Sequence, residues 1–180
     1  MASTADLDSG PTPWLNWRDS PRTIYRLTSG RYRDRAFEGE GARRYGGRWN
    51  HRGIAVVYAS QSLSLACLEA LVQVGPDTLP DEMVSIAAIL PADLPVLRLD
   101  PQALPDTWRR YPASADLQDL GSRWARSGAS AALAVPSAVI PQEWNFLLNP
   151  RHPEFAAIEA MVPEAFAFDS RLVGAEPSFP

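Results

Sequence analysis

Short apolar runs separated by turn-forming residues are the feature that most constrains the fold of this chain. Each run has four to seven residues and is rich in aliphatic, β-branched or aromatic side chains. Such runs predict β-strands. They do not alternate regularly with helices, so an α+β class fits better than a parallel α/β class. The expected strands are residues 23–27, 55–59, 84–90, 96–99, 131–135, 144–148 and 165–168.

Two segments carry helix signals. Ser62 is a plausible N-cap for the run that ends at Gly75-Pro76. A second helix is predicted over 114–126, where apolar residues fall at helical spacing and Gly128 follows as a stop. A short helix is also expected over 154–161.

One carboxylate lies among the apolar residues of the first helix. Glu69 comes four residues after Leu65 and three before Val72, so it lies on or beside the apolar stripe. It is either a boundary residue that reaches solvent or a partly buried acid with a chemical role. On position alone both readings stay open.

The length of 180 residues fits one domain over 21–180, preceded by a loose polar arm over 1–20. No apolar run is long enough to span a membrane, and no signal peptide is recognisable. A single cysteine, Cys67, cannot form an internal disulfide, which fits a cytoplasmic protein. The two histidines, His51 and His152, have no metal-ligand spacing, so no metal site is expected.

The distribution of charge is more informative than the net charge of −4, which argues against a nucleic-acid-binding surface. All 17 basic residues are arginine. Residues 1–52 have 10 Arg against 6 acids, and residues 53–180 have 7 Arg against 15 acids. Residues 28–47 lack periodicity and predict a long loop, which in a compact domain is often functional. The arginines indicate an anionic ligand near this segment, although a GC-rich coding sequence also explains the missing lysine.

Generic catalytic motifs are absent, including GxSxG, Walker, GxGxxG and HExxH patterns. Gly46-Gly47-Arg48 could bring backbone close to a ligand, but such a pair usually marks a turn. Cys67 reads as core filler, and His152, between prolines, reads as a residue that stiffens its loop.

Two long stretches resemble the RES domain family, which is named for an arginine, a glutamate and a serine. YRL and GARRYGGRWNHRGIAVVYASQSLSLACLEALVQV resemble the N-terminal half of the domain, and VPSAVIPQEWNFLLNPRHPEF resembles its C-terminal signature. The likeness covers about residues 22–170. By this resemblance the three residues are Arg26, Glu69 and Ser137, and Tyr58 falls where the family has an active-site tyrosine.

The resemblance implies an ADP-ribosyltransferase-like fold, single-domain and α+β, with a cleft for NAD⁺. It also implies a toxin that is silenced by a helix-turn-helix antitoxin of the Xre type in an oligomeric complex, without direct binding to nucleic acid or membrane. NAD⁺ is then the substrate and phosphate a candidate co-substrate, with no metal or resident cofactor. Phe146 departs from the family, because many relatives are expected to have tyrosine there.

The implied chemistry accounts for the residue types. Cleavage of the nicotinamide–ribose bond passes through an oxocarbenium-like transition state, and nicotinamide leaves as a neutral molecule, so no general acid is required. Glu69 would hold the ribose hydroxyls and stabilise the developing charge, and Arg26 would pair with the pyrophosphate or the ribose edge. Tyr58 would stack on the nicotinamide ring, and Ser137 would hydrogen-bond the ribose or the carboxamide. Arg48 is either a second phosphate contact or packs over its own strand.

Three functions stay open from the sequence. The leading one is a toxin that degrades NAD⁺ by hydrolysis or phosphorolysis. The second is a protein mono-ADP-ribosyltransferase that uses the same residues. The third is a non-catalytic partner of an antitoxin, against which the presence of both Arg26 and Glu69 counts.

Overall fold

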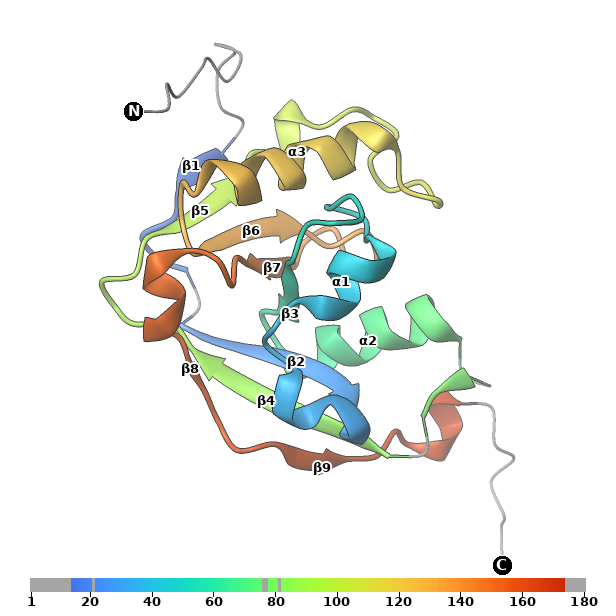
Figure 1. The fold of residues 1–180 in the computed structure, drawn as a ribbon. Helices are drawn as coiled ribbons and strands as arrows, with labels where there is room; N and C mark the ends of the chain where they lie inside the picture. The colour runs from blue at the N-terminus through green and yellow to red at the C-terminus, as the bar shows by residue number, and fades with distance from the viewer. Residues whose placement is uncertain (1–13, 21, 76–77, 81, 174–180) are drawn as a thin grey trace, which may run out of the picture.

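One mixed β-sheet runs through the chain in the computed structural model, which describes residues 14–20, 22–75, 78–80 and 82–173 (Figure 1). The strands are β1 (Trp14–Asn16), β2 (Thr23–Ser29), β3 (Val57–Ser60), β4 (Met83–Ile89), β5 (Val96–Leu99), β6 (Ala132–Pro136), β7 (Trp144–Leu148), β8 (Glu159–Ala160) and β9 (Glu164–Phe166). The α-helices are α1 (Glu40–Tyr45), α2 (Leu63–Val74) and α3 (Ala115–Ser127), and 3₁₀ turns cover Gly30–Arg35, Pro101–Ala103, Pro153–Ala157 and Ser170–Leu172.

The sheet consists of two halves joined at one point. Its order is β1-β5-β6-β7-β3-β2-β4-β8, with β9 also on β4, and only β5 and β6 pair in parallel. β2 pairs with β4 along all seven of its residues, whereas β2 and β3 share the single pair Tyr25–Ser60. The half that contains β2 and β4 therefore diverges from the half that contains β3 and β7 (Figure 1).

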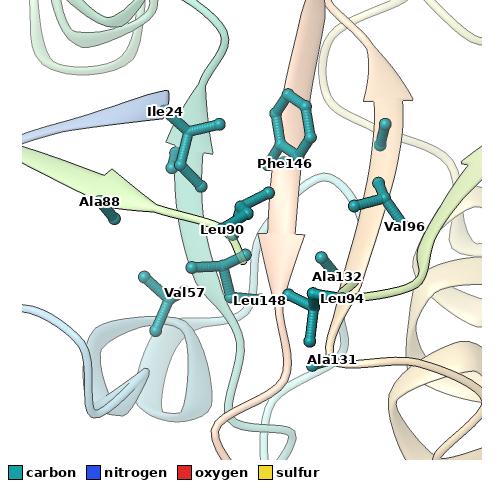
Figure 2. Packing of buried hydrophobic residues seen from close by; sticks show 12 residues of the cluster. Ile24, Val57, Ala88, Leu90, Leu94, Val96, Ala131, Ala132, Phe146 and Leu148 are labelled. Atoms are coloured by element: carbon teal, nitrogen blue, oxygen red, sulfur yellow. The ribbon is translucent and has the colours of Figure 1, made fainter. Parts of the chain in front are cut away.

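Alternating residues along the strands build a separate core on each face of the sheet. On one face, Ile24 of β2 and Ala88 of β4 belong to the same core as Phe146 and Leu148 of β7 (Figure 2). On the other face, α3 covers the upper half of the sheet and buries Trp124 among leucines of β6 and β7. The first core holds the two halves together, because it takes residues from both.

Both long helices predicted from the sequence are present, and each begins directly after the serine expected at its start. The Ser62 side chain accepts a hydrogen bond from the backbone N–H of Leu65 at the start of α2, at 3.2 Å. α3 begins after Ser114 and ends at Gly128, whose φ of 61° is the left-handed conformation that favours glycine. Of the apolar stripe expected on α2, Leu65 is buried, but Val72 is 68% exposed.

Every predicted strand is present, with shifts of one or two residues at some ends. The helix expected over 154–161 is wrong: a 3₁₀ turn covers Pro153–Ala157, and Glu159–Ala160 forms β8 on β4. The free backbone of β4 takes a strand partner there, which a periodicity pattern does not reveal. The expected long loop over 28–47 contains a 3₁₀ turn and α1. In the range expected as an arm, Trp14–Asn16 pairs with β5, and residues 1–13 lie outside the described part of the chain.

Candidate active site

Helix α2 holds Glu69 against the sheet. The helix packs on β2 and β3, with Leu65 and Ala66 of its first turns buried at 1% and 6% exposure. Glu69, one turn further along, is half-buried. Of the two readings open from the sequence, the partly buried acid is the one that the structure has.

The Glu69 carboxylate is hydrogen-bonded through one of its two oxygens. Oε1 accepts from the Ser137 hydroxyl at 2.7 Å and from the Asn145 side-chain amide. The Asn145 carbonyl oxygen in turn accepts from the Ser60 hydroxyl at 2.7 Å, which fixes the amide so that its NH₂ group faces Glu69. Within the described residues Oε2 has no hydrogen-bond partner. One carboxylate oxygen is therefore anchored, and the other can meet a ligand.

Ser137 is oriented by the turn that follows β6. Its hydroxyl accepts the backbone N–H groups of Val139 and Ile140 at 3.1 and 2.9 Å. These bonds occupy the oxygen lone pairs, so the hydroxyl proton is directed to Glu69. Ser137 is fully buried, with 0% exposure. The hydroxyl therefore caps this turn and also donates to the carboxylate.

Arg26 lies on β2 where the two halves of the sheet part. Its Nη1 donates to the backbone carbonyl of Tyr58 on β3 at 2.7 Å, and its Nε is buried without a partner. Burial lowers the pKa of Arg26 to about 10, and no carboxylate forms an ion pair with it among the described residues. An unneutralised, largely buried guanidinium is costly for the fold and favours an anionic ligand.

Tyr58 supports the glycine-rich turn before it. Its phenol accepts the backbone N–H of Trp49 at 3.1 Å and donates to the side-chain oxygen of Asn50 at 2.7 Å. Burial raises the pKa of Tyr58, so the hydroxyl stays protonated and keeps donating. A Cβ at Gly47 would lie 2.6 Å from the phenol oxygen, so this position requires glycine. The hydroxyl is structural, and the ring packs against the core that contains Trp49, so the stacking that the resemblance implies falls to the part of the ring that stays exposed.

Arg48 is held between this turn and the loop before α3. Its Nη1 donates to the carbonyls of Trp108 and Arg110 at 2.8 and 3.1 Å. Burial lowers the pKa of Arg48, while the negative charge of Glu69 acts in the opposite direction. The guanidinium is therefore fixed close to Glu69, with donors to spare. This geometry favours a ligand contact over packing along its own strand.

The structure thus brings the five predicted residues into two linked groups. Glu69 and Ser137 are in direct contact, and Arg26 and Tyr58 are in direct contact. Arg48 contacts neither group directly, but the negative charge of Glu69 opposes the burial that lowers the pKa of Arg48. Arg26 does not contact Glu69. Sequence reasoning missed three residues that orient the site, and the signal for them is a polar residue in or next to an apolar strand: Asn50, Ser60 and Asn145.

Other sequence expectations concern residues away from this site. The ring of His152 accepts the backbone N–H of Glu154 at its Nδ1, which agrees with a loop-stiffening role. Phe146 is fully buried and stacks on Trp17, so a hydroxyl would have no place there. No cluster of three or more potential metal ligands occurs in the described ranges. No helix in these ranges is long and apolar enough to cross a membrane.

The fold and the site define a class of protein: a mixed α+β domain with a carboxylate and two guanidiniums where its sheet divides. The family model that matches is the RES domain, over residues 23–169. A protein named Toxin Res from Yersinia enterocolitica is 42% identical over 150 residues, which cover 83% of this chain and 98% of that protein. The chain belongs to the RES domain family.

Two further comparisons found similar proteins. A protein named Prs ADP-ribosylating toxin from a Sphingobium species is 37% identical over 137 residues, which cover 75% of this chain and 85% of that protein. The crystal structure of the M. tuberculosis MbcT–MbcA toxin–antitoxin complex matches with a TM-score of 0.63 at 21% identity, over 89% of this chain and 90% of that one. This likeness and the mixed sheet with its helices confirm the predicted α+β fold.

Proposed function

We propose that this protein is the toxin of a toxin–antitoxin pair and an enzyme that cleaves the nicotinamide–ribose bond of NAD⁺ in the cytoplasm. The observation that carries the proposal is that two charged side chains, Glu69 and Arg26, lack partners among the described residues for part of their hydrogen-bonding capacity or charge. Glu69 has one anchored and one unpartnered oxygen, and Arg26 is largely buried without a counter-charge. A substrate with a cationic sugar transition state and an anionic pyrophosphate complements both groups.

Some of the site residues stabilise charge on the substrate, and others position the substrate or Glu69. Oε2 of Glu69 accepts a hydrogen bond from a ribose hydroxyl. It also stabilises the positive charge that develops at C1′ as nicotinamide leaves. Arg26, together with Arg48, pairs with the pyrophosphate oxygens. The ring of Tyr58 packs against the nicotinamide. Ser137 acts through Glu69, because its only proton is already donated to the carboxylate.

The leading reaction is attack of water or phosphate on C1′. Water gives ADP-ribose, nicotinamide and a proton, and phosphate gives a phosphorylated ADP-ribose and nicotinamide. Relatives named Toxin Res from Yersinia enterocolitica and Photorhabdus laumondii, at 42% and 40% identity, support the toxin assignment. The structural neighbour is a toxin bound to its antitoxin, which supports an antitoxin partner here, and we assign that partner to the Xre type.

A second candidate is transfer of ADP-ribose to a protein. The Sphingobium relative, at 37% identity, is named as an ADP-ribosylating toxin, and this is the observation that favours it. The bond that breaks is the same, and the nucleophile comes from the target protein. The same site residues serve both reactions.

Incubation of the purified protein with NAD⁺, with and without phosphate, and mass analysis of the products test the proposal. Release of nicotinamide is expected, and the mass of the second product separates hydrolysis from phosphorolysis. ADP-ribosylation is recognised when turnover is negligible until a cell extract is added and a protein gains the mass of ADP-ribose.

Glu69→Gln is the essential comparison, because it keeps the shape of the side chain and removes its charge. Loss of a preorganised charge of this kind costs on the order of 10²-fold or more in rate. Glu159→Gln, at an exposed position on β8, is the matched control and should keep full activity. Wild-type turnover by folded Glu69→Gln would refute the assignment. If none of these incubations released nicotinamide, the protein would be a non-catalytic partner of its antitoxin.

A further inference from the structure

A cavity of about 310 Å³ lies at the opposite end of β7 from Glu69. Asn145 near Glu69 begins this strand, and Asn149 at the cavity follows it, so the two places are about 13 Å apart along the strand at the usual rise per residue. The volume is at the lower end of the range for small-molecule sites. The cavity is lined by Ile54, Ala55, Ala125, Arg126, Gly128, Asn149, Arg151, His152 and Pro153.

The polar lining of this cavity is cationic. The guanidiniums of Arg126 and Arg151 make no hydrogen bond or ion pair among the described residues. No acid is among the lining residues, and the carboxylate of Glu154 is 3.8 Å from Nδ1 of His152.

His152 contributes a third donor. Its Nδ1 accepts the backbone N–H of Glu154 at 3.2 Å, so the proton of the neutral ring is on Nε2. Nε2 has no partner within the described residues. The His152 side chain is 11% exposed, so its ring is held in place at the cavity wall.

These cations are not needed to complete the fold around them. The C-terminal end of α3 is closed by Gly128 in the left-handed conformation, and the Ala125 carbonyl accepts from the Asn149 side chain at 2.9 Å. Arg126 and Arg151 donate to none of the helix carbonyls, so they do not cap the helix. Two guanidinium groups and a histidine N–H belong to the residues that line this cavity. Donors of this kind bind phosphate or carboxylate groups.

We propose that this cavity is a second ligand site, which binds the oxyanion group of a small organic molecule. The three donors hold the phosphate or carboxylate, and Ile54, Ala55 and Pro153 offer an apolar wall for the rest of the molecule. The proposal does not depend on the NAD⁺ reaction, because none of its residues belongs to the Glu69 site.

Titration of the ¹⁵N-labelled full-length protein with inorganic phosphate tests this site by NMR. Chloride keeps the ionic strength constant, and acetate is titrated separately as the carboxylate probe. We expect saturable shifts of the Gly128 and Arg151 amides and of the His152 ring. Tighter binding of phosphate assigns the site to phosphorylated ligands, and tighter binding of acetate assigns it to carboxylates.

Two double variants separate this site from general attraction to positive charge. In Arg126→Gln/Arg151→Gln the affinity at these resonances should fall at least tenfold. All four arginines are exposed, but Arg123 and Arg171 lie outside the cavity, so Arg123→Gln/Arg171→Gln removes the same charge and should change the affinity less than twofold. The proposal is overturned if neither anion shifts these resonances, or if both double variants bind the anion as the wild type does.

Discussion

The two oxygens of the Glu69 carboxylate have different surroundings, and Asn145 is one cause. Its amide donates to Oε1, and Ser60 fixes the direction of that amide. Asn145 therefore positions the carboxylate without needing to contact a substrate. A residue that acts in this way should affect the chemical step more than the binding of NAD⁺.

Replacement of Asn145 tests this positioning role. In Asn145→Ala we expect kcat to fall on the order of 10- to 100-fold, with KM changed less than threefold. In Asn145→Asp two carboxylates face each other, and like charges raise the pH at which both are ionised. The acid limb of the pH–rate profile should therefore move to higher pH. Steady-state kinetics from pH 5 to 9 measures both effects, and wild-type kcat with an unmoved profile would contradict the role.

Arg26 is expected to act in binding. Arg26→Ala removes a charge-assisted contact worth about 1.5–3 kcal/mol, so KM for NAD⁺ should rise on the order of 10- to 100-fold. Arg26→Lys should restore only part of this, because lysine cannot pair bidentately. Arg22→Ala is the matched control: Arg22 directly precedes the same strand and donates to the carbonyls of Pro91 and Leu94, away from the site. Arg22→Ala should lower Tm and leave KM for NAD⁺ unchanged. Unchanged kinetics in Arg26→Ala would refute the binding role of Arg26.

The charged residues of the candidate site could be predicted from the sequence, whereas the residues that orient them could not. Glu69 stands out because a charge on an apolar helix stripe has few structural uses, and Arg26 is identified by the resemblance to the RES domain family. Asn145 and Ser60 do not stand out, because their value depends on a partner about 76 or 85 positions away in the chain. The structural use of the Tyr58 hydroxyl was equally hidden, since it depends on how the preceding turn folds back.

At the scale of elements, the turn over residues 46–51 depends on α3. The Gly47 carbonyl accepts from Gln118 at 2.9 Å, and the backbone N–H of His51 donates to Ser122 at 2.9 Å. Gly121 lies between these contacts, where a Cβ would be 2.0 Å from the carbonyl oxygen of Trp49. The helix thus fixes the turn that contains Arg48.

Gly121→Ala should push α3 away from this turn. Overpacking of this kind costs about 1–3 kcal/mol of the free energy of unfolding. Gly41→Ala is the control, because Gly41 is also helical but has nothing within 4 Å of its Cβ position. It should stabilise the protein by about 0.4–1 kcal/mol. Urea denaturation followed by circular dichroism compares the two, and equal stability changes would show that the close approach is not maintained.

Elements with local signals were predictable, and those defined by partners were not. α2 and α3 have caps and stop signals within their own segments, and β5 and β7 are bounded by turns. β1 and β8 have three and two residues, too few for a periodic pattern. They exist because β5 and β4 have backbone groups to satisfy.

At the scale of the whole molecule, the candidate site depends on the division of the sheet. Arg26 comes from the half with β2 and β4, and Ser137 and Asn145 come from the half with β6 and β7. The single pair between Tyr25 and Ser60 keeps the halves in register at the point where they part. An inhibitor that binds Arg26 and Glu69 together would contact a residue of one half and the carboxylate that the other half anchors, so this site is an economical place to block the enzyme.

An enzyme that destroys NAD⁺ poisons its host unless a partner blocks it, and the arginines of this site, which have no carboxylate partner in the described part of the chain, indicate how. A carboxylate-bearing segment of an antitoxin would pair with Arg26 and Arg48 in place of pyrophosphate. We therefore expect the antitoxin and NAD⁺ to compete. Expression of the protein alone should arrest growth and lower cellular NAD⁺, and co-expression of its antitoxin should restore both.

Binding measurements with Glu69→Gln, which keeps NAD⁺ intact, resolve the competition directly. The apparent Kd of the antitoxin should rise in proportion to the NAD⁺ concentration, as for two ligands of one site. Arg48→Gln should weaken the binding of both ligands, because each pairs with that guanidinium, whereas Arg44→Gln, an exposed arginine on α1, should weaken neither. An antitoxin Kd that is independent of NAD⁺ would place the antitoxin elsewhere on the surface. A soluble, folded protein that neither arrests growth nor lowers NAD⁺ when expressed alone would show that the chain is not a toxin of this kind.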